Sequence, residues 1–188
     1  MLLRSIIGSG ICMLLASGNL LSQTGENQKQ DPILKDFEAR VNNYLELRKK
    51  EAGSPPRPTN SADKLAQNRS QMAGKVREVR SEAKQGDIFT PEIANYFRHQ
   101  TSASLSGPNG NKIRASLHHA EPVDGVALKV NEPYPQGMPL QSIPPTLLST
   151  LPRLPKELQY RIVGSNLALH DTASNLIVDF ISNAIPTP

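Results

Sequence analysis

Two adjacent histidines carry the clearest metal-binding chemistry in this sequence. His118 and His119 are followed closely by Glu121 and Asp124, and imidazole with carboxylate is a ligand set that suits zinc. The segment 113–119 reads as a β-strand, on which neighbouring side chains point to opposite faces. The two histidines therefore do not converge easily on one ion. We expect surface or loop histidines here, and no metal or other cofactor.

A second candidate is His170 beside Asp171, which supplies two residue types of a Ser–His–Asp triad. A triad requires the base and its acid to be arranged in space, and adjacency along the chain does not provide that arrangement. Asp171 also falls where a hairpin turn favours a turn-forming residue. We therefore expect a structural role for the pair. The alternative function is an unfamiliar hydrolase or metal-dependent enzyme that uses His118, His119 or His170.

The most basic part of the chain is the expected second helix, which alternates basic residues with a few acidic ones. Its cations are Lys64, Arg69, Lys75, Arg77, Arg80 and Lys84. Such a face is typical of a solvated helix, or of contact with anionic lipid or acidic glycan. A net charge of only +4 and an aromatic content of 4% disfavour a nucleic-acid partner. Arg69, Lys75, Arg77 and Arg80 are the interaction candidates on this helix.

The helical part is expected to span residues 31–100. Asp31 can cap a first helix with Pro32 at its first position, and its apolar positions, which Arg48 joins, recur every three or four residues up to residue 52. A second amphipathic helix starts near Asn60 or Ser61, either of which can cap it, and ends at Gly86, so that the two form an antiparallel hairpin. Thr90 caps a short third helix.

The β-rich part is expected over residues 113–188, after a Ser-, Gly- and Asn-rich linker at 101–112. Segments 113–119 and 125–131 read as strands. The last segment predicts a three-stranded meander with tight turns at Gly164-Ser165 and Thr172-Ala173. In that register one face carries Leu158, Tyr160, Ile162, Leu167, Leu169, Leu176, Val178 and Phe180. The other face is only partly polar, so we expect something to cover it, either within this chain or from a partner.

Arg161 and Asp179 fall together on the opposite face of that predicted meander, on its two outer strands. An ion pair between them is the simpler interpretation, because a charge on a half-open sheet face commonly meets an opposite charge. The pair is also a candidate interaction site.

The first 22 residues have the pattern of a secretory signal peptide. Arg4 precedes an apolar run from Ile6 to Ala16, and small residues suggest cleavage after Gly18 or Ser22. Cys12 lies inside that run, so the mature chain contains no cysteine. Residues 23–30 read as a flexible leader. No later run is long enough to span a membrane, and we expect a periplasmic or extracellular protein.

The ending ELQYRIVGSNLALHDTASNLIVDFISNAIP, together with GDIFTPEIANYF, resembles a group of uncharacterised exported bacterial proteins. The resemblance is loose over residues 31–99 and closer over 145–186. It implies export, but no activity and no functional residues.

These observations predict an α+β fold, with a helical hairpin and a short third helix followed by a small antiparallel sheet. Apolar residues make up 37% of the chain and 16 residues are proline, so the core is modest. No recognised catalytic motif is present. We expect a non-enzymatic interaction or structural module of the cell envelope, which binds a protein partner or associates with itself.

Overall fold

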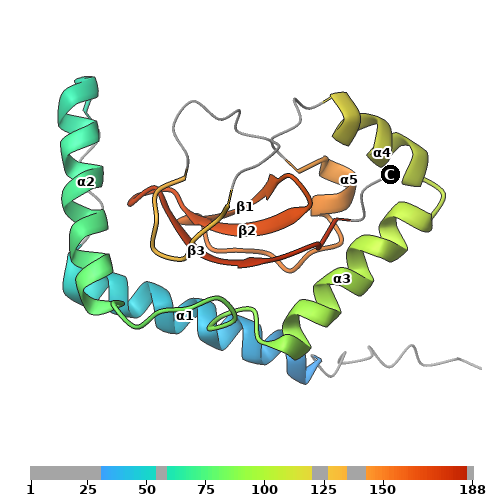
Figure 1. The fold of residues 1–188 in the computed structure, drawn as a ribbon, viewed down its shortest axis with the longest axis horizontal. Helices are drawn as coiled ribbons and strands as arrows, with labels where there is room; N and C mark the ends of the chain where they lie inside the picture. Colours follow the sequence, from blue (N-terminus) through green and yellow to red (C-terminus); the bar gives the residue numbers. More distant parts are fainter. Residues whose placement is uncertain (1–30, 54–58, 120–126, 135–142, 186–188) are drawn as a thin grey trace, which may run out of the picture.

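The computed structural model describes residues 31–53, 59–119, 127–134 and 143–185, and it shows an α+β fold. The expected signal peptide and leader lie outside the described residues. Figure 1 shows the helices following one another around a small sheet. The elements are α1 (Pro32–Ala52), α2 (Ala62–Val79), α3 (Pro91–Ser106), α4 (Gly110–His119), α5 (Pro145–Leu148), β1 (Leu158–Val163), β2 (Asn166–Asp171) and β3 (Leu176–Ile181). No described helix is long and apolar enough to cross a membrane.

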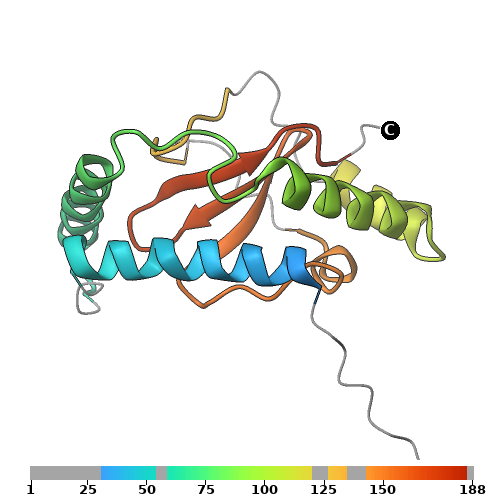
Figure 2. The ribbon, with the colours of Figure 1, turned by 90° about the horizontal axis from the view of Figure 1, so that it is seen from below.

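Helix α1 begins where the sequence predicts. The Asp31 carboxylate accepts a hydrogen bond from the backbone N–H of Ile33 at 2.9 Å, and proline occupies the first position. Its apolar side buries Phe37, Val41 and Tyr44 against the rest of the chain. Figure 2 shows α1 running across the sheet.

Helix α2 differs from the expectation in its end and in its placement. Ser61 caps it, but it ends at Val79 rather than at Gly86, because residues 80–87 turn away to contact the sheet. Only its second half is buried, at Met72, Ala73 and Val76. Figures 1 and 2 show α2 standing across α1 instead of lying antiparallel to it. A helix buried over one half leaves its first half exposed to a partner or to solvent.

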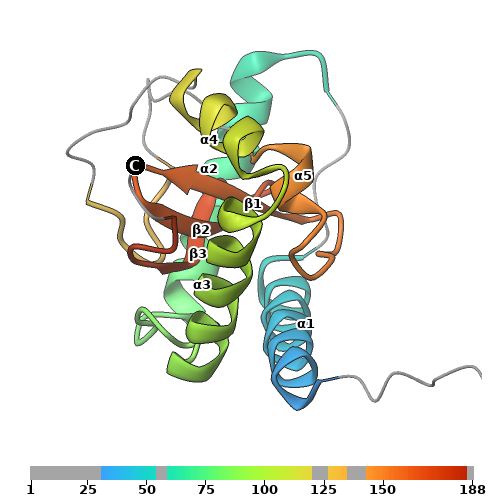
Figure 3. The ribbon, with the colours of Figure 1, turned by 90° about the vertical axis from the view of Figure 1, so that its right-hand side faces the viewer.

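The expected linker at 101–112 and strand at 113–119 are both wrong, since α3 runs to Ser106 and α4 spans Gly110–His119, with only residues 107–109 as a turn between them. Helix α3 continues to Ser106 because Thr101 and Leu105 lie on its buried side, where the Thr101 hydroxyl donates to the Ala184 carbonyl at 2.7 Å. The chain then folds back into α4, as Figure 3 shows from the end of the sheet. A side chain at Gly110 would meet the Leu105 carbonyl oxygen at 1.8 Å, so only glycine fits this return.

The meander forms as predicted in its first hairpin. Gly164 adopts the left-handed conformation (φ 57°), and Tyr160 pairs with Leu169 and Ile162 with Leu167. The second turn is longer than expected. It contains four residues, 172–175, and pairs Asp171 with Leu176. The predicted pairings of Leu169 with Leu176 and Leu167 with Val178 are therefore wrong.

A bulge in β3 explains which residues of this strand change face. The register shifts at Leu169/His170, so that Val178 is an extra residue and Asp179 pairs with Leu169. After the bulge Ile181, not Phe180, joins the main core. The other predicted members of the core face are all buried in that core.

One hydrophobic cluster joins the helices to the sheet, from Phe37 in α1 to Ile185 after β3. Phe37, Phe89 and Phe97 pack with ring centroids 5.1–5.7 Å apart. A smaller cluster on the opposite face of the sheet contains Tyr134, Val163, Ala168 and Ile177. The expected strand at 125–131 is not one over its described residues. Instead the segment 131–134 runs along β3 and covers this face.

Candidate functional site

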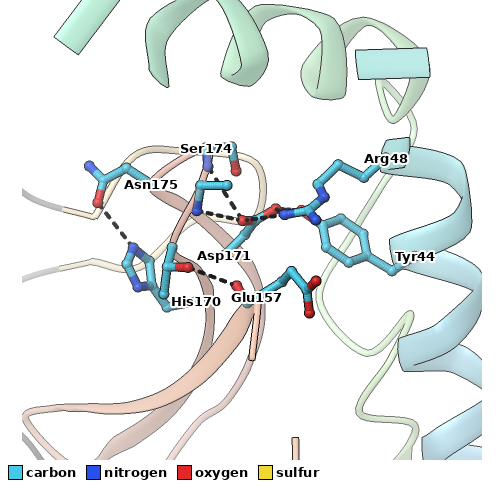
Figure 4. A network of polar contacts seen from close by, with 9 residues as sticks. Tyr44, Arg48, Glu157, His170, Asp171, Ser174 and Asn175 are labelled. Atoms are coloured by element: carbon cyan, nitrogen blue, oxygen red, sulfur yellow. Dashed lines mark hydrogen bonds and ion pairs between the residues drawn. The ribbon is translucent and has the colours of Figure 1, made fainter. Parts of the chain in front are cut away.

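The carboxylate of Asp171, at the end of β2, is fully buried. Tyr44 donates its hydroxyl to one carboxylate oxygen at 2.6 Å, and Arg48 reaches both oxygens at 2.9 and 3.1 Å. The backbone N–H groups of Ala173 and Ser174 donate to the same carboxylate. Figure 4 shows this network joining α1 to the β2–β3 turn. The bonds of Tyr44 and Arg48 link α1 to the sheet, whereas those of Ala173 and Ser174 shape the turn that follows β2. We call this set of contacts the Asp171 network.

The charge of Asp171 also acts on Tyr44. Burial raises the pKa of the Tyr44 hydroxyl well above its ordinary value, and the neighbouring negative charge of Asp171 raises that pKa further. The guanidinium of Arg80 lies 4.9 Å from the centre of the Tyr44 ring. Tyr44 is therefore a fixed proton donor to Asp171, not an acid or base near neutral pH.

His170 and Asp171 point to opposite faces of β2, as neighbours on a strand do. The His170 ring packs edge-on against Tyr134 at 5.6 Å, and its Nε2 lies 3.0 Å from the side-chain oxygen of Asn175. Burial lowers the pKa of His170, so the imidazole is held neutral. The two side chains therefore do not form a base–acid pair.

Asp179 and Arg161 are separated by the sheet, so the prediction that they share a face is wrong. The bulge turns Asp179 toward the helices, where its carboxylate accepts bonds from the backbone N–H groups of Gly86, Ile88 and Phe89 at 2.8–3.0 Å. Burial raises the pKa of Asp179, and those N–H groups oppose the rise. Arg161 lies next to Ala168, on the opposite face.

The basic candidates of α2 divide into exposed and structural groups. Arg69, Lys75 and Arg77 are exposed. Arg80 is half-buried, and its guanidinium donates to the side chain of Asn131 at 3.0 Å and to the Val178 carbonyl at 3.3 Å. Arg80 therefore attaches the end of α2 to the edge of the sheet.

His118 and His119 end helix α4, and their side chains, like Glu121 and Asp124, lie outside the described residues. Within the described ranges no three His, Cys, Asp or Glu side chains form a group that could hold a metal ion.

A hollow of about 550 Å³ lies beside β1, between the strand and the segment that follows α5. Its lining is mainly aliphatic and includes two arginines. The lining residues are Ile143, Leu148, Leu151, Pro152, Arg153, Leu154, Leu158, Gln159, Tyr160 and Arg161. Burial raises the pKa of the Tyr160 hydroxyl, which donates to the Pro152 carbonyl at 3.0 Å. The hollow therefore offers apolar and cationic contacts without a group that exchanges protons near neutral pH.

The sequence patterns predicted neither the hollow nor the Asp171 network. A signal for the Asp171 network was present in the sequence. Arg48 continues the apolar stripe of α1, and a charge on such a stripe requires a buried partner of opposite charge. Nothing local to α1 identifies Asp171 as that partner, 123 residues away. No protein-family model, curated protein or solved structure matches this chain.

Proposed function

We propose that this chain is an exported, non-enzymatic module of the cell envelope that binds another protein. The observation that carries the proposal is the open hollow beside β1. Among the described residues, its lining contains no histidine, carboxylate, cysteine or serine, whereas it offers exposed aliphatic surface at Leu148, which is 46% exposed. A catalytic pocket gathers titratable and nucleophilic groups, and an apolar hollow with few polar groups is suited to binding.

The placement of the reactive side chains supports the same proposal. Asp171, Asp179 and Tyr44 are each fully engaged by hydrogen bonds that join one element to another. His170 is enclosed between Tyr134 and Asn175. These groups stabilise the fold around the hollow and do not line it.

Export rests on the amino-terminal pattern of a charged residue, an apolar run and small residues. It is tested by fractionating the source cells and sequencing the amino terminus of the recovered protein. A terminus after Gly18 or Ser22 in the envelope or culture fluid supports it. An intact Met1 in the cytoplasm contradicts it.

Partner binding is tested by photo-crosslinking in intact cells. A benzoylphenylalanine replaces Leu148 at the hollow, Leu65 on the exposed half of α2, or Glu46 on the exposed side of α1 as a control. A discrete adduct at Leu148 or Leu65, absent at Glu46, supports a binding module. No adduct at any position, combined with turnover of an esterase or peptidase substrate that His170→Ala abolishes, favours the enzyme instead.

A further inference from the structure

The two edges of the sheet differ in how their backbone groups are satisfied. On the β3 edge, Asn131 donates to the Ile177 carbonyl at 2.8 Å, and Ile177 donates to the Glu132 carbonyl at 2.9 Å. Side chains cover the rest of that edge, since Arg80 donates to the Val178 carbonyl and Gln85 to the Phe180 carbonyl. The β3 edge is therefore closed to a further strand.

The β1 edge carries no such cover among the described residues. In a two-residue hairpin the residues flanking the turn form a hydrogen-bonded pair, and such pairs alternate along the strands. With Val163 paired to Asn166, the backbone groups of Leu158, Tyr160 and Ile162 point away from β2. The Leu158 N–H bonds to Pro155. No described residue bonds to the other outward groups of these three residues.

The hollow lies along this open edge. Leu158 and Tyr160 face the main core, whereas Gln159 and Arg161 face the opposite side of the sheet, and all four line the same hollow. Side chains from both faces of one strand can border a single space only where that space follows the strand's edge. The unpaired backbone groups and the aliphatic lining thus belong to one site.

The charged residues among the described lining of the site are both positive. Arg153 and Arg161 are its charged lining residues, and neither takes part in an ion pair within the described ranges. Glu157, the nearest acid before β1, extends toward α1 in Figure 4. Carboxylates arriving from outside would complement these guanidinium groups.

We propose that the hollow receives an extended, acidic segment of a partner protein, which adds to the sheet as a fourth strand beside β1. This proposal rests on the binding module proposed above and names the chemistry of its partner. From Leu158 to Ile162 the open edge is about 17 Å long at ~3.3 Å per residue, enough for about five residues of the partner. Side chains alternate on a strand, so the segment alternates apolar residues facing Leu148 and Leu151 with Asp or Glu facing the arginines.

The test is a selection of random ten-residue peptides displayed on phage against the purified mature protein. We expect enriched sequences that alternate apolar and acidic residues. The best of them is then synthesised with a fluorescent label and measured by fluorescence polarisation, beside a copy whose alternate backbone nitrogens are methylated. Strand addition requires those N–H groups, so methylation is expected to weaken binding at least about tenfold.

The variants are Arg153→Glu, at an exposed lining residue, and Arg161→Gln. Lys35→Glu, at an exposed position of α1, is the matched charge control. We expect the first two to weaken the acidic peptide about tenfold or more, and the control to leave it unchanged. A peptide with Lys in place of its acidic residues is expected to regain affinity for Arg153→Glu.

Three outcomes of the peptide experiments overturn the proposal: no enriched sequence, enriched sequences that are basic or helical, or binding that is indifferent to backbone methylation. Crosslinking in cells separates this failure from that of the module. An adduct at Leu65 without one at Leu148 retains a binding protein and removes the β1 site. The absence of an adduct at both positions contradicts both the binding module and the β1 site. A Leu148 adduct to a second copy of this chain identifies self-association and also overturns the acidic partner.

Discussion

Arg48 in α1 and Asp171 at the end of β2 form an ion pair of 2.9 Å whose side chains are 5% and 0% exposed. The pair is the principal polar link between the first helix and the sheet. Paired, hydrogen-bonded charges can persist in the interior, whereas a lone buried charge is strongly unfavourable. Arg48 and Asp171 are 123 positions apart in the sequence, so α1 and the end of β2 must fold together.

Replacing Arg48 tests how much the Arg48–Asp171 ion pair contributes to the stability of the fold. Arg48→Met keeps an apolar stem but leaves the Asp171 carboxylate with Tyr44 and the turn N–H groups alone. We expect a loss of about 3–5 kcal/mol in the free energy of unfolding, measured by urea denaturation. Lys50→Met is the control, since Lys50 pairs with Glu51 at 81% exposure and should cost about 0.5 kcal/mol or less. Equal losses of unfolding free energy in the two variants would contradict a structural role for the Arg48–Asp171 pair.

His170 predicts a pH dependence of stability. Because burial lowers its pKa in the folded protein, the unfolded chain binds a proton more readily below the ordinary histidine value of about 6.5. The free energy of unfolding should therefore fall as pH decreases from 7.5 through that value toward the lowered pKa. Urea denaturation between pH 7.5 and 5.5 measures it. His170→Gln should flatten the profile, and a variant whose profile still follows the wild type would show that another group causes the dependence.

The sequence predicted the elements whose signals are local. Asp31 and Thr90 cap helices as expected, and the Gly164-Ser165 turn sets the register of the first hairpin. The α+β class is confirmed for the same reason. Helix α4 was missed because IRASLHH contains β-compatible residues at alternating positions, whereas the return at Gly110 beside Leu105 is a tertiary contact that no local pattern carries.

The second hairpin and the site depend on distant partners and could not be predicted locally. Asp171 organises the turn 172–175 by accepting from Ala173 and Ser174, while Arg48 and Tyr44 hold its other side. The bulge brings Asp179 to the N–H groups of Gly86, Ile88 and Phe89, in a loop some 90 residues earlier. A two-residue turn satisfies the apolar alternation equally well, which is why the pattern alone chose the wrong register.

Asp179→Asn tests whether this carboxylate organises the loop between α2 and α3. An amide has one acceptor oxygen, and its NH₂ group would face N–H donors that now bond to Asp179. We expect a loss of about 1–3 kcal/mol in stability, with faster hydrogen exchange at Ile88 and Phe89. Asp63→Asn, on the exposed half of α2, should change neither quantity. Unchanged exchange in Asp179→Asn would mean that the loop holds its shape without the carboxylate.

The shared core predicts that helices and sheet unfold together, even though the sequence suggests a division near residues 101–112. Phe97 is 0% exposed and contacts Phe37, Phe89 and Tyr160, so it joins α1, the α2–α3 loop and β1. Phe97→Ala should lower the free energy of unfolding by about 3–5 kcal/mol, whether followed by helical circular dichroism or by NMR signals of β2. Two separate transitions, with only the helical one shifted, would show that the sheet folds without the helices. Leu148→Ala, at an exposed lining residue, should leave stability nearly unchanged.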